Sequence, residues 1–284
     1  MCVGVARLLG CKVLLHPPCS FFFLYERQGR VWRWFVRKVF SLCDGVAVLS
    51  NEWKKLQEVV PDCRIYYLPN AIDLLSYVDV GREKIESKDD KPCLHVLYLG
   101  HLGKAKGSFD LICAAKTVLG REHGVVFDLV GQEHDIGEME QLNTQVINAG
   151  LEQFIHIKPA VTDVEKIKLF RSADIFVYPS YHEGMPMAVI EAMACALPII
   201  ATKVGGLPDL VYPGLNGLLV PAGQPDQLAK AIHQVVVNPQ MRHSMQMGSF
   251  RLAQENFDIE KLVFRLLDIY QALLSPRLKT PIRA

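Results

Sequence analysis

Short, continuously hydrophobic runs alternate with longer runs of helical period along most of this 284-residue chain. A strand that is hydrophobic at every position needs cover on both faces, as in a parallel sheet between two layers of helices. The alternation therefore predicts an α/β fold built on doubly wound, Rossmann-like sheets. A stretch rich in charge and without apolar period, 74–92, divides the pattern into two parts.

The part that follows residue 92 shows a complete set of these elements. Its expected strands are 95–100, 125–131, 154–159, 174–180 and 198–204. Its expected helices are 107–119, 137–149, 163–171, 186–195, 225–237 and 240–255. The spacing predicts one complete doubly wound domain over 93–257, and the carboxyl ends of its strands are where such a domain binds ligands.

The part that precedes residue 74 offers fewer elements, roughly half of such a domain. Its expected strands are 12–16, 45–50 and 64–69, and its expected long helix is 28–43. We therefore expect a partial N-terminal domain at 1–73 and a linker at 74–92. A last helix within 258–284 is expected to pack back towards the N-terminal domain.

Composition is that of a globular protein, with 50% hydrophobic and 21% charged residues, which excludes a disordered chain. Lys and Arg total 31 against 30 for Asp and Glu, so there is no basic excess to bind nucleic acid. Residues 1–64 nevertheless carry 10 basic and 5 acidic residues, which predicts a different partner for this part. The 8 cysteines form no CxxC pair and are expected to be reduced core residues of a cytoplasmic protein.

The segment HEGMPMAVIEA (182–192) directly follows an expected strand and opens a helix. Pro186 suits the first turn of that helix. The backbone amides of Gly184, Met185 and Met187 then lie at the positive end of the helix dipole. Unsatisfied amides at that end form a site for a phosphate or another anion.

Two glutamates, Glu183 and Glu191, flank this helix start. If the segment is largely helical they lie on the order of 12 Å apart. That is too far for the carboxylate pair of a glycosidase and suits the two polar ends of one extended ligand. Gly205 and Gly206 follow the next strand and predict a tight turn at the same edge of the sheet.

A second loop, in YLGHLGKAKGSFDL (98–111), leads from a strand that ends at Gly100 into a helix. It carries His101, Lys104 and Lys106, and its lysines can neutralise a diphosphate. The loop is neither a Walker A motif nor a GxGxxG fingerprint, which disfavours a dinucleotide-dependent oxidoreductase. On this segment alone, a solvated turn between strand and helix explains the residues equally well.

Taken together, these motifs resemble the donor-binding domain of retaining GT-B glycosyltransferases of glycosyltransferase family 4, also called glycosyl transferases group 1. The segments NGLLVPAGQPDQLAKAI (216–232) and YLPNAID (67–73) resemble that family too, and the likeness covers about residues 10–275. It implies a UDP- or GDP-sugar as donor substrate, no cofactor, and transfer of a hexose with retention to a glycan or lipid-linked acceptor in glycan biosynthesis. It also implies a metal-independent reaction, and the lack of an Asp-x-Asp motif agrees with this.

The resemblance assigns roles to individual residues. Glu183 would contact the transferred sugar, Glu191 the ribose of the nucleotide, and Lys106 the diphosphate. The loop residues expected to complete the donor site are Gly100, His101, Gly184, Met185, Pro186 and Met187. His16, at the end of a strand, resembles a histidine of the N-terminal domain that faces the cleft, although a structural role is the more common one for such a residue.

The chain departs from the family pattern at three places. His101 stands where the family usually has Arg, and a neutral imidazole gives less charge to a leaving diphosphate. Ala196 stands where a turn usually has Gly. About the first hundred residues of the acceptor domain are expected to be missing, so a truncated, non-catalytic fragment that binds a nucleotide sugar is the alternative to an active hexosyltransferase.

The segment RQGRVWRWFVRKVF (27–40) mixes five basic residues with two Trp and two Phe. Two interpretations stay open: a helix that binds a membrane interface peripherally, and a domain helix whose apolar face packs on its own sheet. The second is favoured, with a face made of residues 32, 35, 36, 39 and 40. If the N-terminal domain is partial, Trp32, Phe35 and the run 21–23 are expected to lie uncovered.

Overall fold

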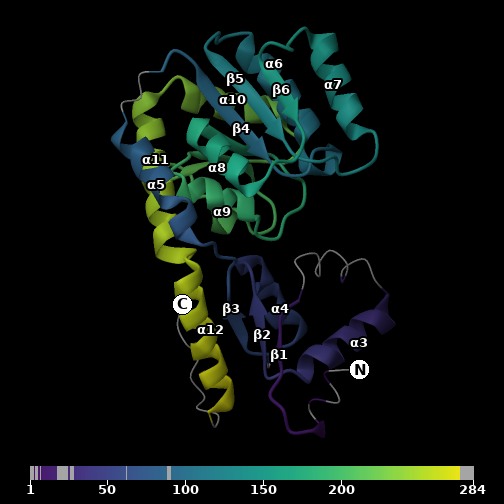
Figure 1. Ribbon diagram of the computed structural model, residues 1–284. Helices are drawn as coiled ribbons and strands as arrows, with labels where there is room; N and C mark the ends of the chain where they lie inside the picture. The colour runs from purple at the N-terminus through teal and green to yellow at the C-terminus, as the bar shows by residue number, and fades with distance from the viewer. Residues whose placement is uncertain are drawn as a thin grey trace. The chain divides into compact units, whose positions relative to one another are not determined.

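The computed structural model describes residues 3, 6, 8–17, 25, 29–61, 63–87 and 91–275. The chain divides into two compact units, each of which holds its own parallel sheet (Figure 1). Unit 1 comprises Met1–Asn70 and Ile259–Ala284, and unit 2 comprises Ala71–Asp258. Among the described residues, no helix combines the length and the apolar character needed to cross a membrane.

Unit 2 is built on a six-stranded parallel sheet with the order β6-β5-β4-β7-β8-β9. The strands are β4 (Leu94–Leu99), β5 (Val125–Val130), β6 (Ile155–Lys158), β7 (Ile175–Tyr178), β8 (Ile199–Thr202) and β9 (Gly217–Val220). The chain order reverses between β4 and β7. The loops that leave the carboxyl ends of these two strands therefore diverge, which opens the crevice where sheets of this kind bind ligands.

Helices cover both faces of this sheet, as its continuously hydrophobic strands require. One layer holds α6 (Ser108–Leu119), α7 (Glu138–Ala149) and α10 (Pro225–Val236), in which α6 packs on the other two. The other holds α5 (Val78–Glu86), α8 (Asp163–Ser172), α9 (Met187–Ala194) and α11 (Pro239–Asn256). The expected doubly wound α/β class is therefore confirmed, with strand residues such as Val96, Phe127 and Phe176 fully buried.

The structure differs from the expected linker over 74–92. This stretch contains a short 3-10 turn, η2 (Leu74–Ser76), and the helix α5, which packs against α8 and α11 of unit 2. Val80 and Gly81 are buried, and a Cβ at Gly81 would lie 2.5 Å from the carbonyl oxygen of Ala194. Arg82, Glu83 and Glu86 lie on the solvent side of this helix, so the density of charge hid its short buried face.

Unit 1 is built on a three-stranded parallel sheet, in the order β1-β2-β3. Its strands are β1 (Leu14–Leu15), β2 (Gly45–Val48) and β3 (Ile65–Tyr67). Its helices are α3 (Arg30–Ser41), α4 (Leu56–Val59) and α12 (Ile259–Leu274), and the 3-10 turn η1 (Asn51–Lys55) directly precedes α4. Val46 and Val48 pack with Phe40 and Leu56 on one face. Ala47 packs on the other face with residues of α12, which comes from the far end of the sequence.

Cysteine chemistry follows the expectation only in part. The six cysteines that the structure describes are all free thiols, but only Cys63 and Cys195 are buried, while Cys11 and Cys113 are exposed. Burial raises the pKa of the Cys63 thiol to about 11 and that of Cys195 to about 12, so neither is a thiolate at neutral pH. The interpretation as core residues is therefore wrong for the exposed pair.

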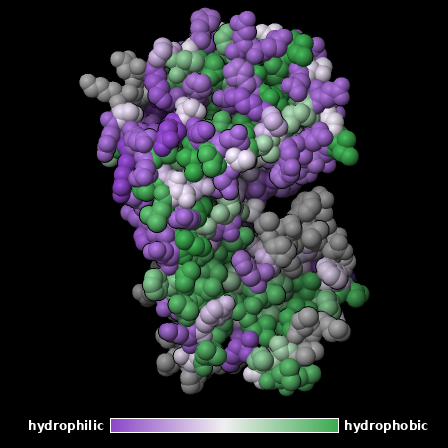
Figure 2. Space-filling view, viewed as in Figure 1, coloured by the Kyte–Doolittle hydropathy of each residue, from purple (hydrophilic) through white to green (hydrophobic). Residues whose placement is uncertain are grey.

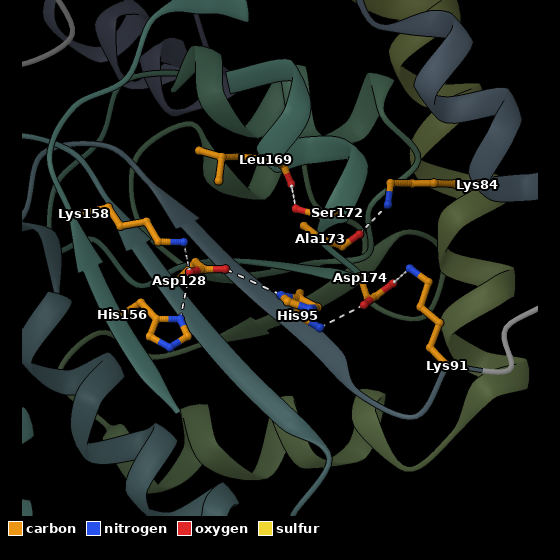
Figure 3. Close-up of polar contacts among 10 residues, drawn as sticks. All are labelled: Lys84, Lys91, His95, Asp128, His156, Lys158, Leu169, Ser172, Ala173 and Asp174. Carbon is orange, nitrogen blue, oxygen red and sulfur yellow. Dashed lines mark hydrogen bonds and ion pairs between the residues drawn. The ribbon is translucent and has the colours of Figure 1, made fainter. Parts of the chain in front are cut away.

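Polar side chains tie the strands of unit 2 together (Figure 3). Asp128 on β5 accepts hydrogen bonds from His156 and Lys158 on β6, at 3.2 and 2.5 Å. Burial alone would raise the pKa of Asp128, but the hydrogen bonds and charges of these two partners outweigh it and lower the pKa. Asp174, directly before β7, accepts from the backbone N–H of His95 at 2.9 Å and from Lys91.

Lys84 of α5 closes the carboxyl end of α8. Its buried ammonium donates to the carbonyl oxygen of Arg171 at 2.9 Å. It also donates to the carbonyl oxygen of Ala173 (Figure 3). These two carbonyls lie at the carboxyl end of α8, where the helix has no further N–H groups that could donate to them. Burial lowers the pKa of Lys84 to about 8. The segment expected to be a linker therefore supplies a helix cap.

Candidate functional site

A largely buried ion pair lies at the crevice between β4 and β7. Lys106 ends the 3-10 turn η3 (Lys104–Lys106) that follows β4, and Glu183 lies in the loop that follows β7. Nζ of Lys106 donates to Oε1 of Glu183 at 2.6 Å. The structure thus brings together two residues that the sequence analysis placed in separate motifs, and places both at the switch point of the sheet.

Close backbone contact holds these two loops together. Gly107 has a φ of +72°, and a Cβ there would lie 2.0 Å from the carbonyl oxygen of Pro179. The N–H of Tyr181 donates to the carbonyl of Ala105 at 3.1 Å. The Tyr181 hydroxyl, which donates to Asp110 at 2.7 Å, ties the β7 loop to the first turn of α6. The separation of Lys106 from Glu183 is therefore fixed by the backbone and not only by their charges.

Two stacked tyrosines lie close to Glu183: Tyr98, the last residue but one of β4, and Tyr178, the last residue of β7. Their ring centroids lie 5.6 Å apart and the rings are 16° from parallel. Burial, and after it the charge of Glu183, raises the pKa of both hydroxyls. Both therefore keep their protons, and the Tyr98 hydroxyl donates to the carbonyl of His101. These two side chains close to Glu183 are neutral.

Glu191 forms a second buried polar centre on α9, where it is 7% exposed. Its Oε1 accepts from Nζ of Lys166 on α8 at 2.8 Å and from the hydroxyl of Tyr77 at 3.1 Å. Burial alone would lower the pKa of Lys166, but the hydrogen bond and charge of Glu191 outweigh it and raise the pKa. Burial, and then Glu191, raises the pKa of Tyr77 to about 12. Oε2 of Glu191 takes part in neither contact.

Sequence reasoning missed Tyr77 and Lys166. Tyr77 falls in the stretch expected to be a linker, and Lys166 was one lysine among several on an ordinary helix. One local signal was available for Lys166: it lies in the first turn of α8, which starts with a capping box formed by Thr162 and Glu165. That box fixes where the helix begins and therefore which lysine faces Glu191.

The other expected residues of this loop surround the start of α9. Pro186 is the N-cap residue and α9 begins at Met187. Met185 and Pro186 are buried, whereas Met187 is exposed. The carbonyl of Gly184 accepts from the N–H of Gly206 at 2.7 Å, so the Gly205–Gly206 turn packs directly on the loop. The predicted turn at this edge is present.

Gly100 and His101 lie at the end of β4. A Cβ at Gly131 would lie 1.7 Å from the carbonyl oxygen of Gly100, so the ends of β4 and β5 approach backbone to backbone. His101 is exposed, and its ring lies edge-on to that of His134, with 6.1 Å between the centroids. At the turn after α9, Ala196 has a φ of +54°. That conformation favours glycine, so alanine occupies a strained position there.

His16 lies in unit 1, directly after β1, with its side chain exposed. The residue before it, Leu15, ends a strand of the three-stranded sheet of unit 1. The role suggested for His16 stays a prediction.

The arrangement in unit 2 has the order and spacing of one known protein family. The model of the family Glycosyl transferases group 1 matches residues 80–249. The chain belongs to the glycosyl transferases group 1 family. The matched segment contains four of the five residues that form the two polar centres, and the fifth, Tyr77, lies just before it. The four are Lys106, Lys166, Glu183 and Glu191.

Relatives of this group 1 chain carry the name D-inositol 3-phosphate glycosyltransferase. That of Nocardiopsis dassonvillei is 28% identical over 242 residues, which are 82% of this chain and 56% of that protein. That of Streptomyces bingchenggensis is 30% identical over 180 residues, 61% of this chain and 39% of that protein. The group 1 chain described here spans about half the length of the curated relatives it matches.

Solved structures agree on the fold of this group 1 chain. HepE of Anabaena, in complex with UDP, matches with a TM-score of 0.77 at 19% identity over 95% of this chain and 75% of that one. Sucrose-phosphate synthase of Thermosynechococcus elongatus matches with a TM-score of 0.71 at 24% identity, over 87% of this chain and 63% of that one. The GT-B type of α/β fold expected from the sequence is therefore confirmed.

Proposed function

We propose that this chain is a glycosyltransferase that transfers a hexose from a UDP- or GDP-sugar, with retention, to a glycan or lipid-linked acceptor. In this proposal unit 2 binds the donor. The observation that carries it is the pair of Lys106 and Glu183 at the switch point of the sheet. Glu191 supplies a second carboxylate on the helix that starts at the same loop.

In this proposal Lys106 binds the diphosphate and Glu183 the sugar. A diphosphate carries more negative charge than a carboxylate, so it competes with Glu183 for the Lys106 ammonium, which now lies 2.6 Å from Oε1. The exchange frees the Glu183 carboxylate to accept hydrogen bonds from sugar hydroxyls. Charge then develops on the diphosphate as the bond to the sugar breaks, where Lys106 and the start of α9 stabilise it.

Glu191 is proposed to bind the ribose. Lys166 and Tyr77 both contact Oε1 and so fix the carboxylate on its helix. Oε2 is then the oxygen that accepts from the ribose hydroxyls. Support for a uridine nucleotide comes from the structural relative HepE, whose structures are described in complex with UDP and with UDP-glucose.

The alternative is that this chain binds a nucleotide sugar without transferring it. The observation behind it is that the chain spans about half the length of its curated relatives. If the chain does transfer a sugar, we propose that the reaction uses no metal or cofactor and that a lipid-linked acceptor brings the chain to a membrane. In both cases we propose that the chain acts in the cytoplasm. Binding and transfer measured separately on the same preparation distinguish the two.

The test is isothermal titration with UDP, GDP and UDP-glucose, together with thermal stability in each ligand, since a ligand that binds only the native state raises the melting temperature. Glu191→Ala should weaken binding of free UDP about 10- to 100-fold, the loss of charged hydrogen bonds worth about 1.5–3 kcal/mol. Glu183→Ala should leave free UDP binding nearly unchanged and remove the preference for the sugar nucleotide. Glu152→Ala, an exposed control, should change neither; equal losses in all three variants would contradict the proposal.

A further inference from the structure

Helix α3 of unit 1 presents aromatic and aliphatic side chains on its outward face. Val36 and Phe40 are buried against the sheet, and they define the inward face. On the opposite side Val31 is 81% exposed, Trp34 64% and Phe35 48%. Within the predicted packing face, Trp32 and Phe35 are exposed, so the expectation that the whole face packs on its own sheet is wrong for these two. The prediction that both lie uncovered is confirmed, and the run 21–23 lies outside the described residues. Large apolar side chains gathered on one exposed face mark an interaction surface.

Basic side chains share this face and its flanks. The helix contains Arg30, Arg33, Arg37 and Lys38 and no acidic residue. By helical spacing Lys38 lies between Trp34 and Phe35 on the outward side. A helix that combines Trp and Phe with several cations binds at the interface of a bilayer, where the rings enter the headgroup region and the cations pair with lipid phosphates.

A pocket of about 340 Å³ adjoins the same helix. Among its described lining residues, the charged groups are Arg37 and Lys38, and the others include Trp34, Val59 and Val60. Nε of Arg37 donates to the hydroxyl of Tyr25 at 3.2 Å, which holds the guanidinium in place at the pocket. Two cations beside apolar walls fit a phosphate group attached to an apolar chain.

We propose that the outward face of α3 docks on an anionic phospholipid bilayer and that the adjoining pocket takes a lipid phosphate. Charge decides between this occupant and a second copy of the chain. Two copies joined face to face would bring the cations of α3 against each other, whereas an anionic bilayer neutralises them. Figure 2 shows that hydrophobic residues also dominate the drawn face of unit 1, in contrast to the hydrophilic surface of unit 2.

The test uses the purified full chain and two kinds of vesicle. One is made of phosphatidylcholine alone, and the other also contains about 30% phosphatidylglycerol, an anionic lipid. Co-sedimentation measures binding, and tryptophan emission reports where the rings lie. Trp53 is buried, so a blue shift on vesicle addition comes from α3. The variants are Trp34→Ala and Lys38→Glu, and the matched control is Lys54→Glu, an exposed lysine of η1 in the same unit.

We expect binding to the anionic vesicles alone, with a blue shift and loss of binding in high salt. Lys38→Glu should weaken it about 30-fold, since each charge near the surface contributes about 1 kcal/mol and reversal removes two such contributions. Trp34→Ala should reduce the blue shift, Lys54→Glu should bind as the unmodified chain does, and inorganic phosphate at millimolar concentration should not displace vesicles. Circular dichroism confirms that each variant is folded.

Equal binding to neutral vesicles would overturn the proposal. So would binding that Lys38→Glu and Lys54→Glu weaken to the same extent, or self-association without vesicles that Trp34→Ala abolishes. Vesicle binding requires neither donor nor acceptor, so this result is independent of whether the chain transfers a sugar.

Discussion

A Cβ at Gly205 would lie 1.8 Å from the carbonyl oxygen of Glu183. The turn that follows β8 therefore meets the loop that carries Glu183 backbone to backbone. The φ of Gly205 is +53°, and the neighbouring N–H of Gly206 donates to the carbonyl of Gly184 at 2.7 Å. The position of Glu183, in the loop after β7, thus depends on a glycine in the turn after β8.

Gly205→Ala should move the Glu183 loop and destabilise the fold. The left-handed conformation alone costs about 1–2 kcal/mol for a non-glycine residue. Gly214→Ala is the matched control, because its φ is +80° and its Cβ would meet nothing within 4 Å. We expect Gly205→Ala to lose more stability than the control in urea denaturation and to lose preference for UDP-glucose over UDP. Equal stability and unchanged ligand preference in both variants would refute this coupling.

Lys166 and Glu191 should be strongly coupled in stability. Their ion pair is largely buried, and removal of one partner leaves the other charge in a site with little water. Lys166→Met and Glu191→Met should each destabilise unit 2 by about 2–4 kcal/mol, and the double variant should lose less than the sum. Lys168→Met, at an exposed position of the same helix, serves as the control and should cost little. Additive losses in the double-mutant cycle would show that the pair is not coupled.

His101→Arg should tighten the binding of nucleoside diphosphates. A permanent charge at the end of β4 adds attraction for a diphosphate near Lys106, worth on the order of a few-fold to tenfold in affinity. The gain should shrink as salt is added, because the residue is exposed and screened. The measurement is titration with UDP. His123→Arg is the control, because His123 is exposed and lies before the amino end of β5. An equal gain in affinity in this control would indicate a general effect of added charge.

Lys84 should make the stability of the fold depend on pH in the alkaline range. Burial lowers its pKa in the folded state to about 8, whereas the unfolded chain keeps the ordinary value of 10.5. Between these values the unfolded state binds more protons, so the contribution of Lys84 to the free energy of unfolding rises as pH increases from about 8 to 10.5. The difference between the native chain and Lys84→Met, measured by urea denaturation at pH 7.5, 9 and 10 (roughly the start, middle and end of that interval), should follow this rise. A difference that stays constant with pH would contradict it.

The sequence by itself determined five of the six strands in the sheet of unit 2 and most of its helices. β7 is hydrophobic at every position, and β4 at every position but His95, because both faces of the sheet are covered. This signal is local. Prediction from this local signal failed for α5 and β9. The first has a buried face only a few residues long beneath dense charge, and the second is a short run that begins with Gly217 and ends before a proline.

The candidate site shows the same division. Lys106, Glu183 and Glu191 were predicted from loops at strand ends and from a family resemblance, both of which are local patterns. Their partners were decided by tertiary structure: Tyr77 and Glu191 are 114 positions apart in the chain. The exposure of Trp34 also depends on which side of α3 the sheet covers. Period and charge can identify an element, but packing selects which of its side chains meet, and that choice is made by residues far away in the sequence.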